Sequence, residues 1–80
     1  MNKYQIIAQD TRSILIINSQ GHIRELYCPF RVQCIYAIDK IVVGSWVWVD
    51  KVTQSVNVVL LYQIHGNLYS FNHFAIHVSF

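Results

Sequence analysis

The chain has 80 residues, of which 54% are hydrophobic and only 12% are charged. An average soluble domain carries about 25% charged residues, so this chain has few of the side chains that normally cover a surface. Its net charge is +2 and its six basic residues are scattered, a pattern that does not favour binding to a polyanion.

Eighty residues predict one domain, spanning residues 1–80. A domain of this size buries roughly 60–65% of the surface of its unfolded chain and cannot enclose so many apolar side chains. We therefore expect either self-association or an apolar face that binds a ligand.

The first strands are predicted in the amino-terminal third. Residues 3–9 alternate between apolar and polar side chains, as a half-buried strand does. Residues 13–18 form a strand that is apolar on both faces, and a short loop with Gly21 joins it to residues 23–28 as a hairpin. Pro29 cannot donate a ladder hydrogen bond and marks the end of that strand.

The middle of the chain predicts two further strands. Residues 31–38 alternate, with four side chains expected to point inward: Val32, Cys34, Tyr36 and Ile38. A connection over residues 39–44 leads to a strand at 46–52, and residues 53–55 are expected to turn the chain.

The longest predicted strand covers residues 56–64. One of its faces is wholly apolar and consists of Val56, Val58, Leu60, Tyr62 and Ile64. On its other face, Val59 and Leu61 are candidates for burial against a partner. A strand at 69–71, a tight turn at 72–74 and a last strand at 75–78 are expected to complete the domain.

Two tryptophans form the most interesting group. Trp46 and Trp48 share one face of their strand, Val47 and Val49 share the other, and both faces are apolar. The tryptophans could fill the core, anchor a protein interface, or form a platform that stacks nucleobases. Three further aromatic residues could join such a platform: Tyr27, Tyr69 and Phe71.

A longer pattern resembles a known kind of protein. Ile41-x-x-Gly44-x-x-Val47-x-Val49 is followed by a hairpin, Tyr62-x-Ile64-x-Gly66-x-x-Tyr69, a one-turn helical step and a closing strand. Over roughly residues 31–78 this is similar to small uncharacterised bacterial SH3-like β-barrel proteins. The resemblance implies an all-β fold: a small, partly open antiparallel barrel of six to eight short strands, here with an added amino-terminal β-hairpin. Such barrels bind peptides, RNA or partner proteins, so the resemblance implies no single role.

Catalytic and metal chemistry have weak support. His73 and His77 are four residues apart, which in a strand separates them by roughly 13 Å, too far to share one ion. Cys28 and Cys34 match neither a redox pair nor a zinc half-site, and we expect free thiols. We expect no enzyme, no metal and no cofactor.

The location follows from what the chain lacks. No apolar stretch approaches the about 20 residues that cross a bilayer, and the first residues do not resemble a secretion signal. The sequence therefore predicts a cytoplasmic protein without a membrane partner.

Three functions are weighed. The first is a non-enzymatic binding or assembly module whose outer strand faces bury against a second copy or a partner protein, through Trp46, Trp48, Val59 and Leu61. The alternative is a binder of a nucleotide or single-stranded nucleic acid on the aromatic face, with phosphate contacts from Arg24, Arg31 or Lys51. The third is a metal- or cysteine-dependent enzyme.

Overall fold

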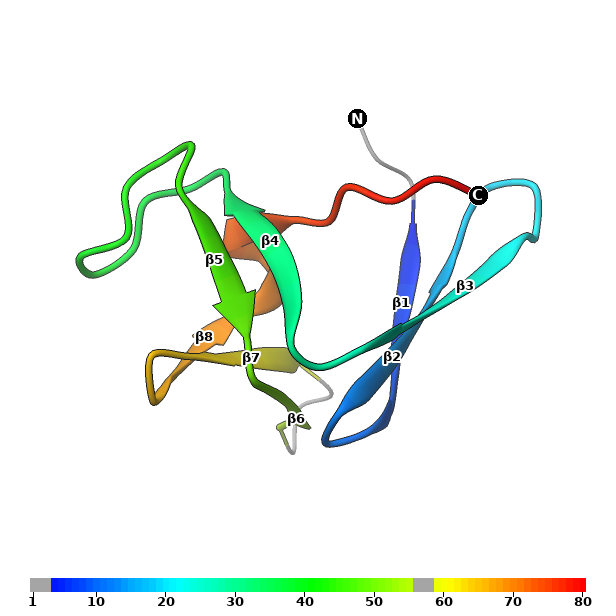
Figure 1. The fold of residues 1–80 in the computed structure, drawn as a ribbon, viewed down its shortest axis with the longest axis horizontal. Coiled ribbons are helices and arrows are strands. Elements are labelled where there is room, and N and C mark those ends of the chain that lie inside the picture. Colours follow the sequence, from blue (N-terminus) through cyan, green and yellow to red (C-terminus); the bar gives the residue numbers. More distant parts are fainter. Residues whose placement is uncertain (1–3, 56–58) are drawn as a thin grey trace.

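The computed structural model describes residues 4–55 and 59–80, which form nine short strands and one turn of 3₁₀ helix (Figure 1). In chain order they are β1 (Gln5–Asp10), β2 (Ser13–Ile17), β3 (Ile23–Tyr27), β4 (Phe30–Cys34), β5 (Trp46–Val49), β6 (Lys51–Gln54), β7 (Leu60–Ile64), β8 (Asn67–Ser70), η1 (Phe71–His73) and β9 (Phe74–Ala75). The predicted all-β class is confirmed.

The strands form three antiparallel sheets of three strands each. We call them the N-terminal sheet (β1-β2-β3), the β4 sheet (β5-β4-β9) and the β7 sheet (β6-β7-β8). Among the described residues none of the three closes into a barrel, and the partly open barrel that the resemblance implies stays a prediction. Pro29 lies between β3 and β4, where the chain passes from the first sheet to the second, and its missing N–H group fits the end of a strand.

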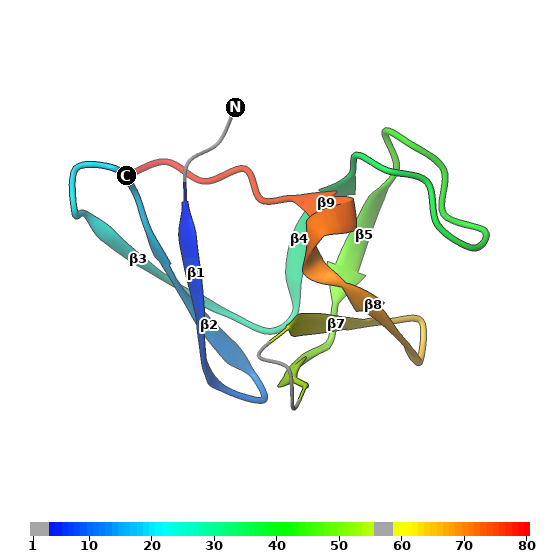
Figure 2. The same cartoon turned by 180° about the vertical axis from the view of Figure 1, so that it is seen from behind.

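The N-terminal sheet confirms the predicted hairpin of β2 and β3, which extends a β1–β2 pair into a three-stranded meander. Figures 1 and 2 show this sheet on one side of the molecule, with the carboxy-terminal segment running across to it from β9. Two backbone hydrogen bonds also tie its β1–β2 turn to the rest of the chain. Cys28 N donates to Arg12 O at 2.7 Å, and Val52 N donates to Thr11 O at 2.9 Å.

The strand predicted at 31–38 ends earlier, at Cys34. Val32 and Cys34 are buried as expected, but Tyr36 is 64% exposed and does not point inward. The alternation stops because the backbone leaves the regular ladder there: Ile35 N and Tyr36 N both donate to the single carbonyl of His73.

The strand predicted at 46–52 is two strands in two different sheets, and residues 53–54 belong to β6 rather than to a turn. The break is at Asp50, whose N–H donates to the Gln63 carbonyl of β7 at 2.9 Å. Val49 and Val52 are both buried although they are three residues apart. The break therefore shifts the in–out alternation by one residue, which local periodicity does not reveal.

The second half of the predicted long strand is confirmed, since Leu60, Tyr62 and Ile64 are all buried on one face of β7. Val56 and Val58 of that predicted face, and Lys3 of the first predicted strand, lie outside the described residues. Two later boundaries differ. Phe71 begins η1 instead of ending a strand, and the closing strand β9 covers only residues 74–75.

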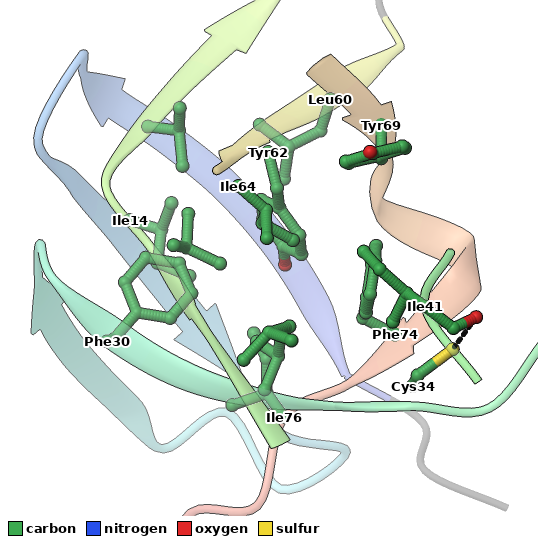
Figure 3. Packing of buried hydrophobic residues seen from close by; sticks show 14 of the residues in the cluster. Ile14, Phe30, Cys34, Ile41, Leu60, Tyr62, Ile64, Tyr69, Phe74 and Ile76 are labelled. Carbon is green, nitrogen blue, oxygen red and sulfur yellow. Dashed lines mark hydrogen bonds between the residues drawn. The ribbon is translucent and has the colours of Figure 1, made fainter. Parts of the chain in front are cut away.

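One apolar core joins the three sheets (Figure 3). Its members come from β2 and from each strand from β4 to β9, with Ile41 and Ile76 from segments between or after the strands. They include Ile14, Val32 and Val49, all fully buried. The Tyr62 ring lies in the middle of the cluster, 5.7 Å from the Phe30 ring in an edge-on pair. Its hydroxyl has no hydrogen-bond partner among the described residues. Desolvation therefore raises the Tyr62 pKa strongly, because the buried site disfavours the phenolate.

Candidate binding face

The β4 sheet decides which face of β5 is core. Val47 and Val49 are 8% and 0% exposed, whereas Trp46 and Trp48 are 46% and 55% exposed. The register explains the choice, because Val47 pairs with buried Val32 of β4. The tryptophans therefore lie on the outer face of the sheet, and their interpretation as core residues is wrong.

Side chains of β4 continue this outer face. Trp48 lies directly opposite Arg31, and Trp46 directly opposite Gln33. The Arg31 guanidinium carbon lies over the Trp46 ring, 4.6 Å from its centroid. A cation over an exposed indole stabilises the pair by about 0.5–1 kcal/mol and fixes the orientation of the arginine.

His77 joins the face from the segment after β9. Its ring centroid is 5.1 Å from that of Trp46, and its Nε2 atom lies 3.0 Å from Gln33 Oε1. The Gln33 amide nitrogen donates to the Gly44 carbonyl at 3.3 Å, so the amide oxygen is the atom that faces the histidine. In this arrangement His77 carries a proton on Nε2 and donates it to Gln33. We call these five residues the tryptophan face: Arg31, Gln33, Trp46, Trp48 and His77.

A hollow of about 240 Å³ opens beside Trp46, between the β4 sheet and β3; we call it the Trp46 hollow. Trp46, Arg31 and His77 contribute to its lining. The rest of the lining is apolar and consists of Leu26, Phe30, Ile76 and Val78. An aromatic and apolar lining with a few polar groups is the usual make-up of a binding site.

The electrostatics of the face are one-sided. Arg24 is exposed and lies two residues before Leu26 on β3, on the same side of that strand as the hollow. The carboxylates that the structure shows in hydrogen bonds have other partners: Asp39 accepts from Tyr69, Glu25 accepts from Tyr27, and Asp10 accepts from Arg12 N and the Ser13 hydroxyl. No carboxylate side chain lines the Trp46 hollow. The lining of the hollow thus contains the positively charged side chain of Arg31 and no carboxylate.

Tyr69, Phe71 and Tyr27 do not extend the tryptophan face into the larger platform that the sequence suggests. Tyr69 is only 8% exposed and donates a 2.9 Å hydrogen bond to Asp39, which raises the Tyr69 pKa. Phe71 lines another, mainly apolar hollow of about 480 Å³ near Tyr4. Tyr27 is exposed, but it lies on the other side of β3 from Leu26.

Val59, Leu61 and Lys51 belong to a different part of the surface. Leu61 is half-buried on β7 and pairs with Thr53, five residues beyond Trp48 along a chain that breaks at Asp50. The tryptophans belong to β5 of the β4 sheet, whereas Leu61 belongs to β7 of the β7 sheet. The four predicted interface residues therefore come from two different sheets and not from one strand face.

The N-terminal sheet carries a second apolar surface. On its outer face Ile7 of β1 pairs with Leu15 of β2. Two residues further along β2, Ile17 pairs with Ile23 of β3. The sequence contains the signal, since β2 is apolar on both faces, but the register was needed to connect Ile7 and Ile23 to it. In the sequence, His77 stands out only as a candidate metal ligand, and nothing there connects it with Trp46.

The structure gives no support to a metal or thiol centre. No group of three metal-ligating side chains occurs within residues 4–55 and 59–80. His73 lies with its Nδ1 atom 3.2 Å from the Tyr36 carbonyl oxygen. Cys28 and Cys34 are free thiols, and burial raises the Cys28 pKa, which disfavours the nucleophilic thiolate.

In the described part of the chain no helix is long and apolar enough to cross a membrane. Comparison of the sequence with protein families, with curated proteins and with solved structures finds no match. The functional conclusion therefore depends on the geometry of the tryptophan face.

Proposed function

We propose that this protein is a non-enzymatic, cytoplasmic binding module whose tryptophan face buries against a protein, either a second copy or a partner. One observation carries the proposal: Trp46 and Trp48 are about half exposed on the outer side of β5 while the valines of the same strand fill the core. Tryptophan and arginine are the residue types most often found as energetic anchors of protein interfaces.

The resemblance to SH3-like barrels forms part of the proposal. Two features support it over residues 31–78. The chain bends from the β4 sheet into the β7 sheet at Asp50, and η1 stands directly before the last strand, as the one-turn step of the pattern requires. In this interpretation the N-terminal sheet is an addition to the small barrel-like unit.

Sedimentation velocity over a wide concentration range tests self-association. We expect the wild type to form a dimer or larger species, and the double variant Trp46→Ser with Trp48→Ser to sediment as a monomer. Ile23→Ser, which removes an exposed apolar side chain from the N-terminal sheet, is the matched control and is expected to leave association unchanged.

Binding to a partner protein is tested with a photo-crosslinking amino acid in living cells. Placed at Trp48 it is expected to capture a discrete protein, and placed at exposed Gln20 in the β2–β3 loop it is expected to capture none. A wild type that stays monomeric and yields no crosslink from Trp48 would contradict the proposal.

The second candidate is binding of single-stranded nucleic acid. It is favoured by the absence of carboxylates from the lining of the Trp46 hollow and by the exposed ring of Trp48. It is disfavoured at Trp46, because Arg31 already covers that ring and a stacking base would have to displace it. Titration with oligothymidylate at low and at physiological salt tests this candidate, which requires binding that weakens steeply as salt rises.

A further inference from the structure

The Trp46 hollow is small and its lining includes one arginine, and the two properties together describe an occupant. At about 240 Å³ it is smaller than the about 300–1,000 Å³ clefts that enclose whole small molecules. Its lining combines polar groups with four apolar residues: Leu26, Phe30, Ile76 and Val78. A space of this size and lining suits one apolar side chain.

Arg31 supplies the polar part of the site. Its guanidinium is held over Trp46, and it makes no hydrogen bond or ion pair with the rest of the described chain. A guanidinium presents its donors in a rigid planar fork that matches a carboxylate, and one that is already oriented loses less entropy when it binds. Arg31 is therefore prepared to receive an anion at the edge of the hollow.

Arg24 is exposed and lies two residues before Leu26 on β3, near the hollow but outside its lining. His77 lines the hollow, and its Nε2 proton is already donated to Gln33. The described carboxylates contribute nothing to the lining, so an incoming negative charge meets only neutral or positive groups there. Charge complementarity thus favours an acidic segment over a basic or a purely apolar one.

We propose that the Trp46 hollow binds an acidic peptide segment of a partner protein, with one apolar side chain in the hollow and a neighbouring carboxylate on Arg31. This inference rests on the proposed function and specifies the partner chemistry of the same face. A nucleotide is the competing occupant, and it would have to displace Arg31 from Trp46 in order to stack there.

Nuclear magnetic resonance titration of the full chain with four probes tests the inference. Three are capped pentapeptides with the central sequences Glu-Leu-Glu, Lys-Leu-Lys and Glu-Gly-Glu, and the fourth is adenosine monophosphate. We expect Glu-Leu-Glu alone to shift the indole N–H signal of Trp46 and the amide of Val78, with a Kd of about 1 mM, as suits so small a contact.

Two charge-matched variants separate the site from a general effect of charge. Arg31→Gln is expected to weaken Glu-Leu-Glu binding by about fivefold or more. Lys51→Gln removes the same charge from exposed β6, outside the hollow, and is expected to change the Kd less than about twofold.

Three results would overturn the inference. The first is equal binding of Lys-Leu-Lys, the second is tighter binding of adenosine monophosphate, and the third is no shift of Trp46 with any probe up to about 10 mM, ten times the expected Kd. None of these touches the sedimentation and crosslinking tests of the proposed function, so the two can fail separately. If crosslinking from Trp48 succeeds while the hollow stays empty in the titration, the face binds a protein without this acidic anchor.

Discussion

Replacing Tyr62 by Phe is expected to stabilise the protein, although Tyr62 is a fully buried residue at the centre of the core. The substitution keeps the edge-on contact with Phe30 and the ring contact with Phe74, whose centroid lies 6.1 Å away. It removes only the hydroxyl, which has no partner among the described residues. The folded wild type and the folded variant therefore differ by one polar group that is buried away from water.

The size of the effect follows from that group. A buried hydroxyl without a hydrogen bond costs about 1–3 kcal/mol. The void that its removal leaves, on the order of 10–15 Å³, costs about 0.3 kcal/mol at 24 cal/mol per Å³. Tyr62→Phe should thus raise the free energy of unfolding by about 1 kcal/mol, and the melting temperature of an 80-residue domain by about 4–8 °C.

The pH dependence gives a second readout. The folded pKa of Tyr62 lies above its unfolded value of 10.0, so above that pH the unfolded chain loses a proton that the folded chain keeps. The contribution of Tyr62 to the free energy of unfolding is therefore constant below pH 10. Above pH 10 this contribution falls, by up to about 1.4 kcal/mol per pH unit. Tyr62→Phe is expected to flatten this alkaline fall.

Urea unfolding of both proteins at neutral and at alkaline pH measures these quantities. Tyr62→Leu is the control, since it also removes the ring contacts and is expected to destabilise by roughly 2 kcal/mol. If Tyr62→Phe lowers the free energy of unfolding by about 1 kcal/mol or more, the hydroxyl has a hydrogen bond in the folded protein and the reasoning is refuted.

Further predictions concern β5, the 35–45 loop and β3. Val49→Ala should lower the free energy of unfolding, measured in urea, by about 2 kcal/mol, because Val49 lies in the core. Trp48→Ala should lower it by less than about 0.5 kcal/mol, because Trp48 is exposed. The reverse order would mean that the two faces of β5 are wrongly assigned. Tyr69→Phe removes the donor to Asp39 and should speed amide exchange in the loop; unchanged exchange would show that the bond does not hold the loop. The hydrogen bond from Tyr27 holds the Glu25 pKa below its ordinary value of 4.5, so stability from this group is present above pH 4.5 and falls as the pH drops below it. Glu25→Gln should reduce the loss of stability below pH 4.5. If the variant loses stability with the same pH dependence as the wild type, Glu25 does not cause that loss.

The sequence alone predicts much of the fold because strand signals are local. The all-β class, the β2–β3 hairpin and the buried face formed by Leu60, Tyr62 and Ile64 follow from alternation and turn residues. The exposure of Arg31 follows in the same way. These features need only the period of two that every strand imposes on its own side chains.

The sequence could not predict where the chain leaves one sheet for another. At Asp50 the backbone turns from β5 into β6, the alternation shifts by one residue, and Val49 and Val52 are both buried. A shift of one residue reverses the face of every later side chain, and only pairing with another strand fixes it. The partly open barrel that the resemblance implies depends on the same pairings.

The candidate site shows the same division. The sequence places Trp46 and Trp48 on one face of a strand, but both faces were apolar, so it could not assign that face to core or solvent. The pairing of Val47 with Val32 decides it. His77 reaches Trp46 only because the carboxy-terminal segment runs past the β4 sheet. Composition and period determine which residues can share a face, whereas only the packing of distant strands determines which face is left for a partner.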